Sequence, residues 1–140
     1  MLEESTGIVL KSTPFRDTSI ITRVFTREFG KISLLAKGVR KSKQGNAGIL
    51  ESMNHINFHI NYNSDKDLQI FRDLTLISSL TKIRANYERL ISGLAMVDMI
   101  DKTIQVNDAS IILFRLLRQT LIELNNPKSN IIYLYLFFQF

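Results

Sequence analysis

The hydrophobic period of this chain changes from two residues to about 3.6 near Ile83, and this change restricts the folds open to it. Before that point, short runs rich in Ile, Val, Thr and Phe alternate apolar and polar positions, which is typical of half-buried strands. After it, apolar residues recur at three- and four-residue spacings, which indicates amphipathic helices. We therefore expect an α+β fold, with a β domain over residues 1–80 and a helical domain over residues 81–140.

Five strands are predicted in the β domain. The clearest alternation places Ile56, Phe58 and Ile60 on one face of a strand. Pro14 ends the first strand, and Gly30 stands where a hairpin turn needs a positive φ angle. Five strands joined by polar turns favour a small barrel such as the OB-fold. An SH3-like barrel and an open meander produce the same pattern, so the residues alone leave these three open.

Three helices are predicted in the helical domain. The first is expected to bury a stripe made of Tyr87, Leu90, Ile91, Leu94, Val97 and Ile104. Asn107 or Asp108 can cap the second helix, and Asn126–Pro127 opens a third that is almost wholly apolar to Phe140. Because such a helix needs neighbours on several sides, we expect either a truncated bundle or self-association through this helix.

Positive charge is concentrated in one part of the chain. The net charge is +5, yet the nine Lys and Arg residues within 11–43 are opposed only by Asp17 and Glu28, a local balance of +7. The remaining residues are therefore net negative. A localised basic surface favours a polyanionic partner such as nucleic acid. A protein-interaction module with a basic face for acidic partners is the alternative from another class.

The segment KISLLAKGVRKSK at 31–43 contains the densest group of cations. The first candidates for phosphate contact are Lys37, Arg40, Lys41 and Lys43. A second group of candidates comprises Arg16, Arg23, Arg27 and Lys31. Arg40 leads because a guanidinium group can bind phosphate in a bidentate manner. The purely structural alternative is a solvated loop whose lysines keep a sheet edge from aggregating.

Aromatic and histidine side chains add less specific signals. Phe15 and Phe29 lie in turns beside basic residues and are the candidates for stacking on bases. His55 and His59 share a strand face and are expected to be exposed. No cysteine and no nearby pair of carboxylates completes a metal site around them, so neither a metal nor another cofactor is expected.

Nothing in the sequence points to catalysis or to a membrane. There is no Walker-type phosphate loop and no G-x-S-x-G motif, so the chain is not expected to be an enzyme. The N-terminal MLEESTG is not a signal peptide, and the longest apolar run, 131–140, is shorter than the roughly 20 residues of a membrane span. Together with the absence of cysteine, this predicts a soluble, cytoplasmic protein.

Three motifs occur together in the β domain: GIVLK at 7–11, FTREFGK at 25–31 and AKGVRK at 36–41. In this combination the chain resembles the DNA repair protein RecO family over about residues 5–80, and more loosely beyond. The resemblance implies a recombination mediator with an N-terminal OB-fold, which binds single- and double-stranded DNA and anneals complementary strands. It also implies DNA contact at Lys37, Arg40 and Lys41.

The resemblance implies partners as well: RecR, RecA and single-strand-binding protein, in a cytoplasmic, nucleoid-associated setting. The apolar stripe of the predicted helices is most simply a core, and its functional alternative is a groove for the acidic, apolar tail of single-strand-binding protein. In that alternative, Arg115 and Arg118, on the polar face of the second predicted helix, receive the acidic residues of the tail. Many family members carry a four-cysteine zinc site that this chain lacks. An RNA-binding barrel of the translation apparatus remains an alternative, because phosphate contacts do not discriminate the sugar and only the resemblance favours DNA.

Overall fold

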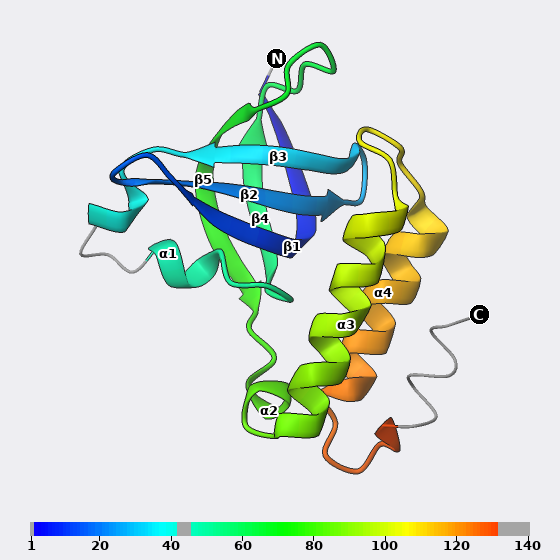
Figure 1. Ribbon diagram of the computed structural model, residues 1–140. Helices are drawn as coiled ribbons and strands as arrows, with labels where there is room; N and C mark the ends of the chain where they lie inside the picture. The colour runs from blue at the N-terminus through cyan, green and yellow to red at the C-terminus, as the bar shows by residue number, and fades with distance from the viewer. Residues whose placement is uncertain (1, 42–45, 132–140) are drawn as a thin grey trace.

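The computed structural model describes residues 2–41 and 46–131. Its strands are β1 (Glu3–Phe15), β2 (Ser19–Thr26), β3 (Gly30–Ala36), β4 (His55–Ile60) and β5 (Gln69–Ser78). They close into a barrel in the order β1-β2-β3-β5-β4 (Figure 1). All neighbours are antiparallel except β3 and β5, which pair in parallel. This is the predicted five-stranded OB-fold, and the barrel is confirmed.

The barrel closes because β1 pairs with both of its neighbours, β2 and β4. Its first half, Glu3–Ile8, pairs with β4, while residues from Gly7 onward pair with β2. An irregularity between Val9 and Lys11 lets the long strand bend from one partner to the other. Gly30 begins β3 with φ 72° and lies against the backbone of the chain near Asp108, so a side chain would not fit there.

The helical part lies beside the barrel. The short elements are η1 (Val39–Lys41), α1 (Asn46–Ile49) and α2 (Thr81–Arg84), and the long ones are α3 (Tyr87–Thr103) and α4 (Ile111–Leu124). Helices α3 and α4 run antiparallel on one side of the barrel, and α1 lies towards the other side (Figure 1).

The caps of the long helices come from their own preceding residues. The Asn86 side chain accepts the backbone N–H of Arg89 at α3. At α4 the cap is Ser110, not Asn107 or Asp108 as the sequence suggested. The reason is that the amide oxygen of Asn107 already accepts the hydroxyl of Tyr62, and its backbone N–H donates to β3.

The buried face of α3 was predicted correctly only in part: Val97 is buried and Leu90 and Ile104 pack against the core, whereas the other three predicted residues are exposed. Its buried residues are Arg89, Gly93, Met96, Val97 and Ile100. By contrast, Tyr87, Ile91 and Leu94 are 78%, 48% and 36% exposed. The helix turns its glycine towards Met53 and packs closely there, and Arg89 becomes buried because it finds acceptors inside. A pattern based on apolar residues alone does not anticipate the burial of this glycine and this arginine.

Two apolar clusters form the core. One fills the barrel and includes Val24, Leu34 and Phe58. The other joins the barrel to the helices, with Phe25 from β2 and Phe114 from α4 meeting edge to face at 6.1 Å between ring centroids. The two parts of the chain therefore share a buried apolar interface.

Two points concern the rest of the chain. The prediction that Asn126–Pro127 opens a third helix is wrong, because residues 126–129 form a turn in which the Ser129 N–H donates to the Asn126 carbonyl. Residues 132–140, which carried the rest of that helix and the predicted self-association, lie outside the described residues. Across the described ranges, no helix has the length and apolar character that crossing a membrane requires.

Candidate nucleic-acid interface

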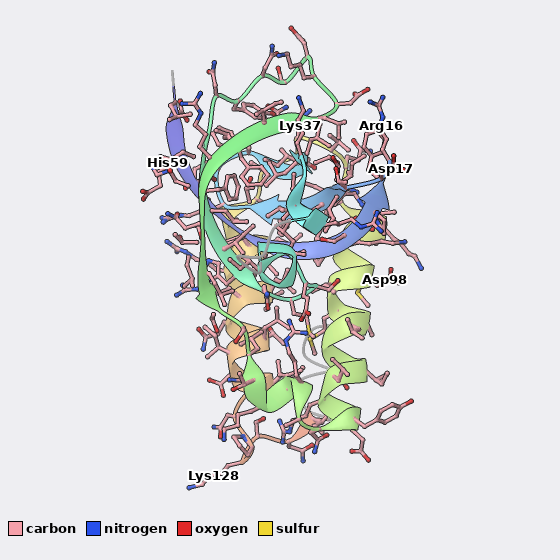
Figure 2. All side chains as sticks on the ribbon, turned by 90° about the vertical axis from the view of Figure 1, so that its left-hand side faces the viewer. Arg16, Asp17, Lys37, His59, Asp98 and Lys128 are labelled. Atoms are coloured by element: carbon pink, nitrogen blue, oxygen red, sulfur yellow. The ribbon has the colours of Figure 1, made fainter. Side chains whose placement is uncertain are left out.

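Arg16, Lys37 and Arg40 lie together at one end of the barrel, and we call this group the basic cluster. Arg16 lies in the turn after β1, while Lys37 and Arg40 follow β3. Figure 2 shows Arg16 and Lys37 at the same end of the molecule, far from Lys128. All three side chains are exposed. Within the described ranges, none of the three forms an ion pair with an acid.

Backbone contacts hold the two segments of the basic cluster together. The backbone N–H of Arg40 donates to the carbonyl of Thr18 at 2.9 Å, and its guanidinium donates to the carbonyl of Arg16 at 3.3 Å. Gly38, with φ 67°, makes the sharp turn that leads the chain out of β3. The cations therefore lie on two loops that are joined by hydrogen bonds.

Phe15 lies beneath one of these cations. The Arg16 guanidinium is 5.0 Å from the centroid of the Phe15 ring, which is cation–π geometry. Arg16 also has a positive φ of 55°, so the turn presents its side chain in an uncommon backbone conformation. One face of Phe15 is therefore already covered by the arginine.

Three further predicted cations are either incompletely described or lie away from the basic cluster. The backbone of Lys41 ends η1, but its side chain is outside the described set, as is the whole of Lys43. Arg27 is exposed in the β2–β3 turn, and its backbone N–H donates to the carbonyl of Thr6. Because β3 begins at this turn and ends near Lys37, Arg27 lies a strand's length from the basic cluster.

Arg23 and Lys31 are engaged by a carboxylate from α3. Arg23 donates from Nε and Nη2 to the two oxygens of Asp101, at 2.7 and 2.6 Å. Lys31 Nζ donates to the Asp101 carbonyl at 2.6 Å. The Asp101 side chain is only 8% exposed, and its hydrogen bonds raise the pKa of Arg23 further above its usual value. Phosphate contact by these two residues stays a prediction, and a phosphate would compete there with Asp101.

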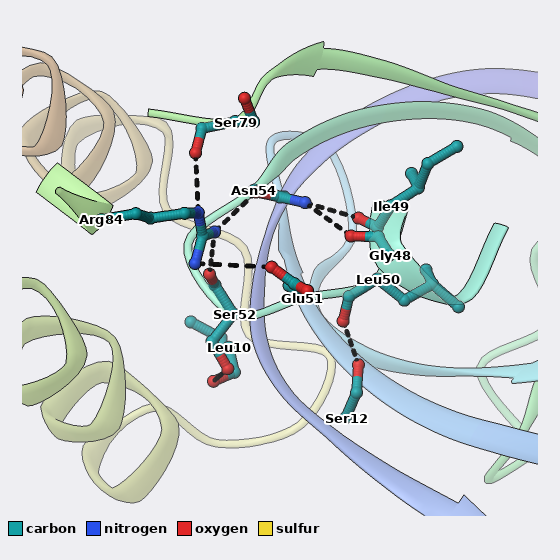
Figure 3. A network of polar contacts seen from close by, with 10 residues as sticks. All are labelled: Leu10, Ser12, Gly48, Ile49, Leu50, Glu51, Ser52, Asn54, Ser79 and Arg84. Atoms are coloured by element: carbon teal, nitrogen blue, oxygen red, sulfur yellow. Dashed lines mark hydrogen bonds and ion pairs between the residues drawn. The ribbon is translucent and has the colours of Figure 1, made fainter. Parts of the chain in front are cut away.

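Arg84 forms a second tie between the helices and the barrel. Its guanidinium donates to the Asn54 side chain and the Ser52 carbonyl at 2.7 Å, and to the Ser79 carbonyl at 2.9 Å (Figure 3). Glu51 lies 3.6 Å away. These contacts join α2 to the segment that enters β4, so Arg84 has a structural role at this junction.

An apolar hollow opens beside Lys37. Its volume is about 360 Å³, and it is lined by Leu35, Ala36, Lys37, Gly38, Val39, Ile70, Phe71 and Leu74. It forms because β3 and β5 pair only through Leu34–Gln69 and Leu35–Ile70 and then diverge. The sequence reasoning did not single out the β5 residues of this hollow. Phe71 and Leu74 share a side only because Asp73, at φ 57°, interrupts the alternation of the strand.

Phe29, the second predicted stacking residue, has a different surrounding. Its ring stacks on Tyr62 with centroids 4.3 Å apart and planes 20° apart. The Tyr62 hydroxyl donates to Asn107 at 2.7 Å, and burial raises the pKa of Tyr62 above its usual value. Phe29 follows β2 at the opposite end of β3 from Lys37, so it lies away from the basic cluster.

Arg115 and Arg118 are exposed on α4 and border a second hollow, of about 380 Å³. Its other lining residues are Thr6, Arg27, His55, Ile77 and Phe114. Three arginines from two elements thus surround a partly apolar depression.

The two histidines are half-buried, so the prediction that they are exposed is wrong. His55 lies under α4, where its ring meets that of Phe114 at 6.1 Å and its Nε2 is 2.6 Å from the Thr6 hydroxyl. Burial, helped by the charge of Arg118, lowers the pKa of His55 to about 4. His59 lies 3.4 Å from a carboxylate oxygen of Glu4 and from one of Asp73.

Comparison with known proteins gives one consistent result. The family described as "Recombination protein O N terminal" matches residues 1–80. The DNA repair protein RecO of Prosthecochloris aestuarii is 32% identical over 130 residues, which is 93% of this chain and 49% of that protein. The protein of the same name from Bacillus cytotoxicus is 34% identical over 121 residues, or 86% of this chain and 48% of that protein. The chain spans about half the length of the curated relatives it matches.

Proposed function

The chain belongs to the recombination protein O family, and on that premise we propose that it is a DNA repair and recombination mediator that binds DNA strands through the basic cluster. Its relatives are named DNA repair proteins. The proposed activity is binding and annealing of strands without a catalytic step. Both single- and double-stranded DNA are ligands in this proposal, since binding depends on phosphate contacts that both share.

The observation that carries the proposal is the convergence of Arg16, Lys37 and Arg40. They come from two separate segments, are exposed, and lack an acidic partner in the described part of the chain. A cation already paired with a carboxylate gains little from a phosphate, whereas these three keep their charge available. Lys41 and Lys43 adjoin them in the sequence and extend the proposed contact.

The chemistry follows from the phosphate backbone. Each cation that neutralises a phosphate releases a condensed counterion, and this entropy gain drives binding. Two strands neutralised in the same way repel each other less, which lowers the barrier to annealing. Backbone contacts carry no sequence information, so bound strands can still slide until their bases are in register.

A second proposal concerns a partner protein. Arg27, Arg115 and Arg118 border one hollow, and Ile77 beside them is 51% exposed. An acidic and apolar tail, such as that of single-strand-binding protein, fits this combination of charge and exposed apolar surface. RecR and RecA are proposed partners on the family relationship alone.

The test of DNA binding is fluorescence anisotropy of a labelled single strand across a salt series. If about four to six phosphates are engaged, the slope of log affinity against log salt should be near −3 to −4. The double variant Lys37→Glu/Arg40→Glu should weaken binding strongly, and each lost phosphate contact should make the slope shallower by about 0.7. The double variant Lys82→Glu/Lys128→Glu is the matched control, because it reverses the same number of charges at two exposed lysines of the helical part, and Lys128 lies at the far end of the molecule (Figure 2).

The alternatives give different results. A folded protein that binds no strand at low salt would overturn the proposal and favour a module for an acidic protein. Equal loss of affinity in the control and in Lys37→Glu/Arg40→Glu would mean that net charge matters and the basic cluster does not. Competition between DNA and RNA strands of one sequence distinguishes repair from an RNA-binding role. For the tail, an acidic, apolar peptide should bind the wild type and fail to bind Arg115→Glu/Arg118→Glu.

A further inference from the structure

We propose that the hollow between β3 and β5 receives one unstacked base of a bound single strand, with Phe71 as the surface on which the base stacks. The proposal rests on the proposed function, because it assumes a strand held at the basic cluster. It goes further by assigning a site that discriminates single strands from duplex. The residues that define the site are Phe71, Ile70 and Leu74 on one wall and Leu35 on the other.

The hollow has the shape and size of a pocket for a small ligand. Two strands that pair through only two residue pairs leave an opening in the barrel wall, about 360 Å³ in volume. This lies within the roughly 300–1,000 Å³ of pockets that hold small organic ligands. A single nucleobase is a flat group at the small end of that range, so the hollow can admit one base without rearrangement of the strands.

The walls of the hollow suit an apolar, flat ligand. Phe71 is half-buried, so part of its ring faces outward, and the neighbouring Ile70 is 57% exposed. Exposed aliphatic and aromatic groups around a concave surface favour an apolar, flat ligand. Bases stack on aromatic side chains whatever their identity, because every base has a π face. The site would therefore tolerate sequence variation, as a strand-annealing protein requires.

Positive charge lies at the edge of the hollow. Lys37 belongs both to the lining of the hollow and to the basic cluster, and no described lining residue is acidic. Gly38 and Val39 connect the lining directly to Arg40. A strand whose phosphates contact Lys37 and Arg40 thus has its bases within reach of the hollow. An apolar peptide would satisfy the walls but would leave these cations unpaired, which favours a nucleic acid strand as the occupant.

Discrimination follows from base pairing. In a duplex the bases are stacked and paired, so none can enter the hollow without the cost of unstacking. In a single strand that cost is small. Duplex DNA would then be bound through phosphates alone, whereas a single strand gains the stacking contribution as well.

The experiment compares two strands of equal length and charge. One is an oligothymidine strand, and the other carries abasic sites in place of its bases. Both are measured by anisotropy with the full chain at one salt concentration. The wild type should bind the thymidine strand about 5- to 150-fold more tightly, as stacking of one base contributes. Phe71→Ala should remove that preference and leave the salt slope and the affinity for duplex unchanged.

A second pair of variants protects the test against misfolding of Phe71→Ala. Ile70→Ser changes an exposed wall residue of the hollow, and Leu76→Ser changes a residue of the same strand that is 43% exposed and outside the hollow. Ile70→Ser should reduce the preference for the thymidine strand, and Leu76→Ser should keep it.

Each outcome has a distinct meaning. Equal binding of both strands by the wild type, with a normal salt slope, overturns the base site and leaves the proposed phosphate contacts standing. No binding of either strand overturns the proposed function itself. A preference that survives both Phe71→Ala and Ile70→Ser in folded proteins places base contact elsewhere and overturns the assignment to this hollow.

Discussion

Two regions of this molecule carry cations, which are unpaired in one region and paired with an acidic residue in the other. At the barrel end, Arg16, Lys37 and Arg40 are exposed, and no carboxylate in the described part of the chain pairs with them. At the junction between barrel and helices, Arg23 and Lys31 are both held by Asp101. The side chains are of the same kind and come from the same stretch of the chain. The difference lies in whether the fold brings an acceptor to them.

This difference separates structural cations from available ones. An arginine whose donors are satisfied inside the protein contributes to stability and has little left for a phosphate. An exposed, unpaired cation contributes little to stability and keeps its charge for a partner. The two regions should therefore respond in opposite ways when residues are replaced: the junction in unfolding free energy, the basic cluster in DNA affinity.

The largest loss of stability is expected for Arg89→Met in the helical part. Arg89 is 7% exposed and donates to the carbonyls of Leu124, Pro127 and Ser129. Its removal takes this donor from the buried Leu124 carbonyl and from the two partly buried carbonyls, which should cost about 3 kcal/mol of unfolding free energy in urea denaturation. Arg115→Met, the same replacement at an exposed site, should cost about 0.5 kcal/mol or less. Equal losses would contradict the structural role of Arg89.

A smaller loss is expected for Asp101→Ala, because its partner Arg23 is 38% exposed and stays partly solvated. We expect about 2 kcal/mol, with a double-mutant cycle against Arg23→Ala showing coupling between the two. Asp98→Ala, on the same helix, breaks only the exposed pair with Lys102 and should cost about 0.5 kcal/mol or less.

The same Asp101→Ala variant should also change DNA binding. It frees Arg23 from its carboxylate, whereas Lys31 keeps its hydrogen bond to the backbone carbonyl of residue 101. If Arg23 then reaches a phosphate, the salt slope of single-strand binding should steepen by about 0.7. An unchanged slope would restrict DNA contact to the basic cluster and Arg27.

The next effect depends on pH. Since the pKa of His55 falls from 6.5 to about 4 on folding, the unfolded chain takes up a proton in the range where the folded chain does not. Stability should therefore decrease as the pH falls from 6.5 towards 4, and change little from this cause above 6.5. His55→Gln should flatten that decrease in urea denaturation at several pH values. His59→Gln, at the other histidine, serves as the control, and an identical flattening there would contradict the assignment.

The smallest effect on stability is expected at the basic cluster. Lys37→Glu should change the unfolding free energy by about 0.5 kcal/mol or less, because the side chain is exposed and unpaired. Its effect should appear in DNA binding instead. A large loss of stability in thermal or urea unfolding would show that Lys37 has a structural role and would remove the contrast between the two regions.

Much of the barrel could be predicted from local pattern. The alternation of Ile56, Phe58 and Ile60 was enough to place a strand and its buried face, and all three side chains are buried. Gly30 marked a turn correctly by its need for a positive φ angle. Local pattern sufficed here because a strand in a small barrel has one buried face and a strict period of two.

The helices were less predictable for a physical reason. Helix α3 buries Gly93 and Arg89 and leaves Tyr87 and Ile91 exposed, so its buried face is decided by close packing and by internal acceptors. A prediction from apolar character alone would bury Tyr87 and Ile91 and expose Gly93 and Arg89. The half-burial of His55 was missed in the same way, since α4, which covers it, is about sixty positions away in the sequence.

The sequence by itself determined the fold class, the family and the concentration of positive charge within residues 11–43, because these depend on composition, period and local motifs. Only the tertiary structure decided which of those cations are available. Asp101 lies about seventy positions from Lys31, and their meeting depends on how α3 packs against the barrel. The hollow at Phe71 likewise exists only where β3 and β5 diverge. Pairing over such distances is a property of packing, and no local pattern encodes it.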